Sequence, residues 1–331
     1  MLELEYENGY IQLHFCTIDG SHSMDAAVLN KCIYEYLGII KEVSTKYQLV
    51  ATVESEALTE GGIRHWLKVT LPTKEAFKRE FIMALLIDLA LSPFHATIEE
   101  VTSKLVERLT TPTEILELQD EATKAELEYK IAWYKKETAK LSSTVNKNVI
   151  DKKKSNFYTS AKSCSKIQAI EFCWLDAAKE THCIQKIEST QFESLVLSTD
   201  ELEPKLDEEA IIEIVSPVLK KGKYKWTGIY KGEVISFVVK SNEFKTLIQT
   251  GRISFKNGTS IKCDLSIKRK LDEDGNEKIK GYEVLAVNEY FVNEKPVETP
   301  EGKRKRQQKE ADARLLQLIF DDTQTPDEGQ K

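Results

Sequence analysis

The clearest alternation of hydrophobic and polar positions lies in the C-terminal part of the chain, over residues 210–293. Short runs of β-branched and aromatic residues predict strands there, and Lys231-Gly232 and Asp274-Gly275 predict hairpin turns. Between the third and fourth runs, Phe244, Leu247 and Ile248 have helical spacing. The predicted order of three strands, a short helix and two longer strands is typical of an OB-type five-stranded β-barrel, with an SH3-like barrel as the close alternative.

The first 72 residues predict a small α+β domain. Residues 2–18 alternate in two runs, and Asn8-Gly9 between them indicates a hairpin. From Met24 the apolar residues recur at helical spacing, and two further strands are predicted at residues 49–58 and 63–71. We therefore expect a ββαββ domain over residues 1–72, near the small end of what folds alone.

Residues 73–146 predict a helical region with helices at 74–91, 97–109 and 114–142. The longest helix has a seam at a four–three spacing, formed by Ile115, Leu118, Ala122, Ala125, Tyr129 and Ala132. Such a seam is typical of a coiled coil, although alanine makes it a weak one. It predicts that this helix packs along the domain or against a second copy of itself.

Charge divides the rest of the chain. Residues 147–199 predict a basic linker followed by a small α/β segment, and the linker contains Lys147 and the run Lys152–Lys154. Residues 200–209 predict an acidic, solvated linker, because six of the ten residues are Asp or Glu. Residues 294–331 predict a tail in which the basic run Lys303–Arg306 precedes a short leucine-rich helix.

Composition limits the class of protein. The chain has 331 residues, 41% of them hydrophobic, which is enough for more than one domain core, and its formal net charge of −7 argues against wholesale nucleic-acid binding. Its six cysteines are scattered and its first residues are acidic, so we expect a cytoplasmic protein with reduced thiols. The most apolar run, residues 81–91, is too short to span a bilayer, so we expect no membrane partner.

Motifs that would indicate catalysis are missing from the sequence. It contains no glycine-rich phosphate loop, no H-E-x-x-H and no G-x-S-x-G. The nearest approach to a zinc ligand set consists of Cys164, Cys173, His182 and Cys183. These residues lack the paired spacing of a zinc knuckle, so we expect no metal there.

A second group near the N-terminus contains the residue types of a hydrolase or a metal site: His14, Cys16, Asp19 and His22. His14 and Cys16 alternate on a predicted strand, which favours ordinary packing, and a polar capping loop uses the same residue types as the other two. We therefore expect no catalytic residue, no metal ligand and no cofactor.

One stretch of the predicted barrel is a candidate binding surface, in which lysines interleave with aromatic residues: Lys220, Lys221, Lys223, Tyr224, Lys225 and Trp226. Single-stranded nucleic acid binds to such surfaces, where lysines contact phosphates and aromatic rings stack on bases. The alternative is that Tyr224 and Trp226 face the barrel core and the lysines are solvated, since alternation alone produces this pattern.

Three stretches carry a resemblance to a group of uncharacterised bacterial proteins: residues 21–26 (SHSMDA), residues 149–158 (VIDKKKSNFY) and the barrel opening from Ser216-Pro217 to Trp226. The resemblance implies an N-terminal α+β domain, a C-terminal small β-barrel and a bacterial or phage-related source. It supplies no catalytic residues.

Two functions follow as hypotheses. The first is a non-catalytic macromolecule-binding or regulatory protein that acts through the C-terminal barrel and the helical region, with a protein partner or self-association expected. The alternative is a nucleic-acid-associated protein, single-strand binding or nuclease-like, that uses the Lys220–Trp226 face.

Overall fold

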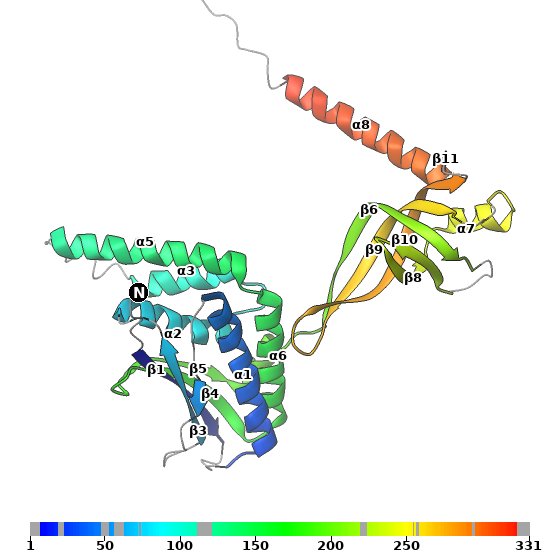
Figure 1. The fold of residues 1–331 in the computed structure, drawn as a ribbon. Helices are drawn as coiled ribbons and strands as arrows, with labels where there is room; N and C mark the ends of the chain where they lie inside the picture. The colour runs from blue at the N-terminus through cyan, green and yellow to red at the C-terminus, as the bar shows by residue number, and fades with distance from the viewer. Residues whose placement is uncertain are drawn as a thin grey trace, which may run out of the picture. The chain divides into compact units, whose positions relative to one another are not determined.

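The computed structural model describes residues 7–18, 23–47, 53–55, 63–71, 73, 75–110, 121–218, 224–253, 255, 258–292 and 295–322. Tertiary contacts divide the chain into two units (Figure 1). Unit 1 comprises Met1–Asp200 and Leu271–Asn276, and unit 2 comprises Glu201–Lys270 and Glu277–Lys331. The predicted α+β class is confirmed: unit 1 contains one sheet, and unit 2 contains a closed five-stranded barrel.

Unit 1 is built on an antiparallel sheet of order β2-β3-β1-β4-β5. Its strands are β1 Glu7–Thr17, β2 Val53–Ser55, β3 Ile63–Leu71, β4 Ile167–Leu175 and β5 Thr181–Glu188. The first strand lies in the middle, between β3 and β4. The sheet of the expected 1–72 domain is thus completed by strands from residues 167–188, so those first residues share one core with the rest of unit 1.

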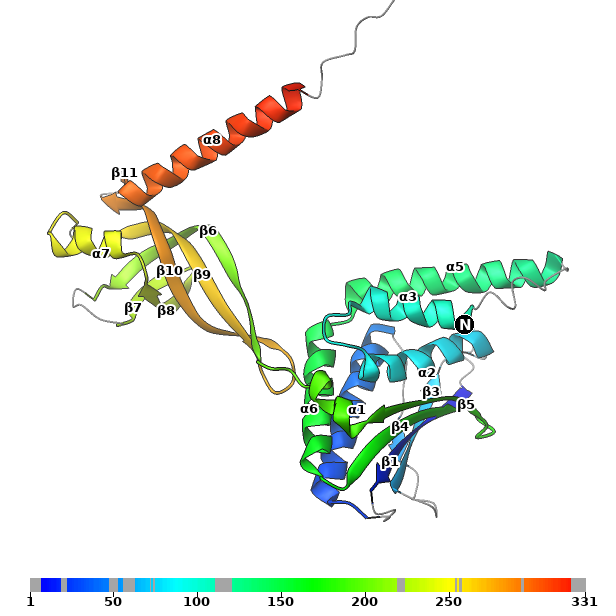
Figure 2. The same ribbon diagram turned by 180° about the vertical axis from the view of Figure 1, so that it is seen from behind.

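Helices cover one face of this sheet (Figure 2). Helices α1 Ala26–Tyr47, α2 Ala76–Leu91 and α6 Lys147–Ser163 pack on it, while α3 Ile98–Leu109 and α5 Glu121–Thr144 pack farther out, next to α2. Alternate residues of β1, Ile11, Leu13 and Phe15, enter the core under the helices. The residues between them, including His14 and Cys16, therefore belong to the opposite face of the sheet.

The hairpin predicted at Asn8-Gly9 is wrong, because β1 runs through both residues as one continuous strand. Gly9 serves a different purpose there. A Cβ atom at this position would lie 2.9 Å from the Cε of Met83 in α2, so glycine allows the strand to approach the helix closely. Residues 2–6, the other half of the predicted hairpin, lie outside the described residues.

The predicted basic linker is also wrong in its first part, where residues 147–163 form helix α6. Ile150, Phe157, Tyr158 and Ala161 of this helix are buried in the core of unit 1. Their spacing of seven, one and three residues is that of a helix face. The charged run within α6 hid this pattern in the sequence.

All three lysines of that run have acidic partners in unit 1. The Nζ of Lys152 lies 2.7 Å from Asp200, and the Nζ of Lys154 lies 3.2 Å from Asp151. The Nζ of Lys153 lies 3.4 Å from the buried Glu35. The run is therefore a set of ion pairs and not a free basic surface.

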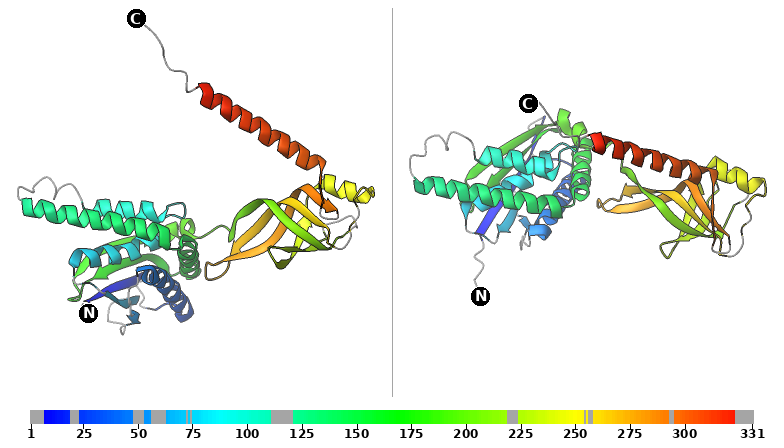
Figure 3. Two further views of the ribbon diagram at one scale, coloured as in Figure 1. Left: turned by 45° about the horizontal axis from the view of Figure 1, so that its top comes forward. Right: turned by 90° about the horizontal axis from the view of Figure 1, so that it is seen from above.

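Unit 2 consists of β6 Glu201–Ser216, β7 Trp226–Tyr230, β8 Glu233–Val239, α7 Asn242–Gln249, β9 Ser260–Leu271 and β10 Glu277–Val292. The order β10-β8-β7-β6-β9 closes into a barrel through a β9–β10 pairing. The predicted acidic linker is instead the first half of β6, which pairs with β9 from Glu201 onward. Strand β11 Lys295–Glu298 pairs antiparallel with the end of β10. Helix α8 Pro300–Asp322 begins against β10 and continues past the barrel (Figure 3).

Several local predictions for the barrel are confirmed. The hairpin between β7 and β8 turns at Lys231 and Gly232, both with positive φ, as the left-handed turn chemistry requires. The predicted short helix is α7, and its first turn is capped by Ser241, whose Oγ accepts a hydrogen bond from the backbone N–H of Phe244. Phe244 then packs into the barrel core.

The seam predicted for the long helix lies on the wrong face. In α5, Ala125, Tyr129 and Ala132 are exposed, whereas Tyr134 and Leu141 are buried. The larger apolar residues follow a different register from the alanines, and their greater buried area decides which face packs. Ile115 and Leu118 lie outside the described residues, as does the side chain of Ala122.

Candidate functional site

The predicted binding stretch falls at the start of β7. Lys220, Lys221 and Lys223 lie outside the described residues. Tyr224 and Lys225 precede the strand, and both side chains are exposed. These two residues therefore form the described, accessible part of the predicted surface.

Trp226 has a different position from the one that base stacking would need. Only 4% of it is exposed, and its indole packs in the barrel core against Phe237, Phe244 and Phe255, with ring centroids 6.2, 6.4 and 5.3 Å away. Its place in the strand explains this, because β7 begins at Trp226 and alternate residues from there, Gly228 and Tyr230, are also buried. Trp226 is a core residue, as the alternative interpretation of the stretch expected, but Tyr224, which the same interpretation placed in the core, is exposed.

The outer surface of β7 and β8 was not singled out from the sequence. Ile229 pairs with Val234, and Thr227 pairs with Ser236, so the outward residues of the two strands form one small surface. Val234 is 71% exposed, more than any other large hydrophobic side chain among the described residues. We call Thr227, Ile229, Val234 and Ser236 the β7–β8 face.

Charged residues around this face are mostly balanced by partners. The Oη of Tyr230 donates a hydrogen bond of 2.6 Å to Asp207, and this bond lowers the pKa of the carboxyl group. Lys231 lies 3.1 Å from the same carboxylate. On β10, Glu283 lies 3.4 Å from Lys240 and 3.0 Å from Lys268. The rim of the face is thus polar and nearly neutral.

The basic run of the tail is likewise paired. It forms the second turn of α8, where Arg304 lies 2.6 Å from Glu243, Lys305 lies 2.6 Å from Asp264 and Arg306 lies 2.9 Å from Glu298. A hollow of about 410 Å³ lies beside this helix, and Lys305 and Arg306 line it together with acidic residues. Since these cations already have anionic neighbours, the hollow is not a concentrated anion site.

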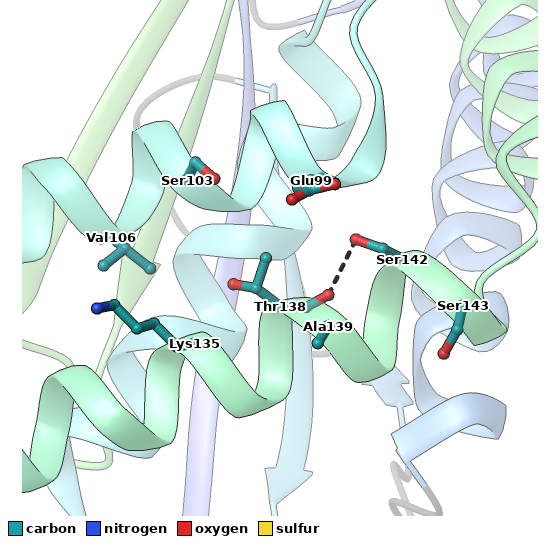
Figure 4. Close-up of a pocket in the computed structure, with 8 residues that line it drawn as sticks. All are labelled: Glu99, Ser103, Val106, Lys135, Thr138, Ala139, Ser142 and Ser143. Carbon is teal, nitrogen blue, oxygen red and sulfur yellow. Dashed lines mark hydrogen bonds between the residues drawn. The ribbon is translucent and has the colours of Figure 1, made fainter. Parts of the chain in front are cut away.

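A second hollow, of about 670 Å³, lies between α3 and α5 in unit 1 (Figure 4). Short side chains line it, including Ser103, Thr138, Ala139 and Ser142, and the Oγ of Ser142 donates a hydrogen bond to the carbonyl of Thr138. Apart from Glu99 and Lys135, its lining is uncharged. This hollow lies in the predicted helical region, and its lining residues form no catalytic combination of side chains.

No protein-family model, curated protein or solved structure matches this chain. Within the described part of the chain, no helix is long and apolar enough to cross a membrane. The candidate site therefore rests on the geometry of the barrel itself. The sequence alone does not show that Val234 is exposed. Alternation along β8 defines two faces of the strand but does not show which of them faces the barrel core.

Proposed function

We propose that this chain is a non-catalytic macromolecule-binding protein that acts through its C-terminal barrel, with the helical region of unit 1 as a further contact surface. The barrel topology supports this most strongly. Strands β6, β7, β8, β10 and β9 are neighbours in that order, and α7 lies between β8 and β9, the third and fourth strands of the barrel. This order supports an OB-type barrel, a fold in which the face of the second and third strands and the adjoining loops bind oligonucleotides and oligosaccharides.

The chemistry of the β7–β8 face favours a protein partner. Its centre offers aliphatic Val234 and Ile229, and hydroxyls of Thr227 and Ser236 lie beside them. An apolar centre with a polar, nearly neutral rim is typical of a protein interface. A nucleic-acid groove would instead collect unpaired cations and exposed aromatic rings.

Site-specific photo-crosslinking tests this proposal. The full chain would carry a benzophenone amino acid at position 234 in its native cells. A control would carry it at Ile279, an aliphatic residue of β10 that is also exposed, 56% against 71% for Val234. We expect a discrete protein adduct from position 234 and none from position 279. Equal adducts at both positions, or none at 234, would contradict the β7–β8 face as the interface.

Single-stranded nucleic acid is the second candidate ligand, and Tyr224 and Lys225 favour it. Both side chains are exposed at the loop between the first two barrel strands, where OB-type barrels often contact nucleic acid. Unit 2 also contains 24 Lys and Arg against 21 Asp and Glu, a formal charge of +3.

Fluorescence anisotropy with a labelled oligonucleotide and the full chain tests this second candidate. Binding should weaken steeply with salt, because neutralised phosphates release counterions. Lys225→Glu should weaken it and flatten the salt dependence, while Lys186→Glu in unit 1 serves as the control. No binding at micromolar chain and low salt would remove this candidate and leave the protein partner.

A further inference from the structure

Three potential metal ligands meet on the face of the unit 1 sheet opposite the helices. His14 and Cys16 are two residues apart on β1, so their side chains share that face. Glu171 of β4 is the direct cross-strand partner of His14. The sheet register therefore brings a nitrogen, a sulfur and an oxygen ligand to one point.

The distances between these atoms suit a single ion. The Nδ1 of His14 lies 2.9 Å from the Oε2 of Glu171 and 3.8 Å from the Sγ of Cys16. All three ligand atoms lie within 4.8 Å of one another. With zinc bonds of about 2.0–2.3 Å, tetrahedral ligands of one ion are separated by about 3–4 Å, so small side-chain movements would complete the site.

The site is accessible as well as compact. The side chains of His14 and Glu171 are 20% and 28% exposed, and Cys16 is partly exposed. A fixed position on adjacent strands of a five-stranded sheet also limits the movement needed for binding. Among the described residues, no other group of three or more His, Cys, Asp and Glu side chains has its ligand atoms this close together.

Two cations lie in the same row across the sheet. Arg64 of β3 is the cross-strand neighbour of His14, and Lys186 of β5 is that of Glu171. Lys186 already lies 3.1 Å from Glu188, which offsets part of its repulsion of a metal ion. Loss of the thiol proton on binding would leave a thiolate and a carboxylate to balance a divalent ion, so the ion and its three ligands would together be neutral.

We propose that His14, Cys16 and Glu171 form a binding site for a divalent transition metal of the zinc class. Thiolate and imidazole ligands select zinc over magnesium or calcium, which prefer oxygen ligands. Three protein ligands leave one coordination position, which water or a bound ligand would occupy on the side facing away from the sheet. This site is separate from the barrel and does not depend on the function proposed for it.

Cobalt(II) substitution tests the site with a spectroscopic readout. The untagged full chain would be reduced, treated with a chelator, exchanged into metal-free buffer and titrated with Co²⁺. We expect one ion per chain and an absorption band from thiolate-to-cobalt charge transfer, which Zn²⁺ should abolish by displacement. Cys16→Ser should remove that band, and Glu171→Gln should weaken binding by about tenfold or more.

Cys164→Ser is the matched control, since Cys164 is also a partly exposed free cysteine but lies at the end of α6. Circular dichroism of each variant verifies that the fold is retained. The proposal is wrong if the full chain binds no Co²⁺ or Zn²⁺ at micromolar concentration. It is also wrong if the charge-transfer band persists in folded Cys16→Ser or disappears in Cys164→Ser.

Discussion

Trp226 illustrates what a single residue's position in a strand decides. Tyr224 and Trp226 have the same parity, and alternation alone would place them on one face. The strand begins only at Trp226, however, so the alternation does not apply to Tyr224, which is exposed. The run of lysines and aromatic residues therefore shows neither where the strand begins nor which of its rings a ligand can reach.

The first prediction compares these two aromatic residues. Trp226→Ala should lower the free energy of unfolding by about 3–5 kcal/mol, because it leaves a cavity among the three phenylalanines of the core. Tyr224→Ala should change it by less than about 0.5 kcal/mol. Urea denaturation followed by circular dichroism measures both. Equal effects of the two substitutions would contradict the buried position of Trp226.

Lys154 is the residue whose environment differs most from its sequence context. It belongs to a run that predicts a solvated linker, yet its side chain is fully buried, and its Nζ donates a hydrogen bond of 2.7 Å to the carbonyl of Ser92 beyond α2. Burial lowers the pKa of this amine to about 8, although Asp151 opposes that change.

The second prediction follows from that pKa. Between about pH 8 and the ordinary lysine value of 10.5, the unfolded chain binds more protons at this position than the folded chain does. The contribution of Lys154 to stability should therefore rise with pH across this window and be constant below it.

Urea denaturation of the wild-type chain and Lys154→Met at several pH values measures this contribution. The stability of the wild type relative to the variant should increase as the pH rises above about 8. The difference between the two free energies of unfolding cancels the contributions of groups that titrate equally in both proteins, such as the buried tyrosines. A difference that is flat or falls with pH would contradict the lowered pKa.

At the scale of elements, local pattern predicted much of the chain. The helices at 76–91 and 98–109 lie close to their predicted limits, and α7 and the two long strands of the barrel occur in the predicted order. Each has a clear apolar period and a capping or turn residue at its end. Elements rich in charge were missed, since α6 and the start of β6 gain their stability from distant partners that no local window contains.

The candidate metal site was missed for the same reason. His14 and Cys16 were visible as neighbours on one predicted strand face, but Glu171 lies 157 positions from His14. Only the pairing of β1 with β4 brings them together. The register between strands far apart in the sequence depends on the complete core, so the pattern along β1 could not indicate its third ligand.

The third prediction concerns β6. A protease that cleaves after glutamate has three targets in the segment predicted as a linker, Glu201, Glu208 and Glu209, because Pro204 follows Glu203 and blocks cleavage there. Because this segment pairs with β9, the native chain should resist cleavage there far longer than the urea-unfolded chain. Mass spectrometry of a digestion time course locates the cuts. Rapid cleavage of the native chain at these sites would support the linker and contradict the strand.

At the scale of the whole molecule, the two units have opposite net charges. The formal charge of −7 is the sum of −10 in unit 1 and +3 in unit 2, so the total hides a mildly basic barrel. The sequence predicted this barrel from its order of elements. It could not predict the β7–β8 face, because the exposed position of Val234 depends on how the sheet closes.

Affinity capture with three full-length baits tests most directly whether the β7–β8 face binds a macromolecule. The wild type, Val234→Glu and the control Ile279→Glu would be incubated with extract of native cells, with and without nuclease. Mass spectrometry and absorbance would quantify the protein and nucleic acid retained. The account predicts that the wild type and Ile279→Glu retain the same saturable partner, and that Val234→Glu retains at least about tenfold less, as expected for a charge placed at the centre of an interface. Equal retention by Val234→Glu, or no saturable partner for the wild type, would contradict it.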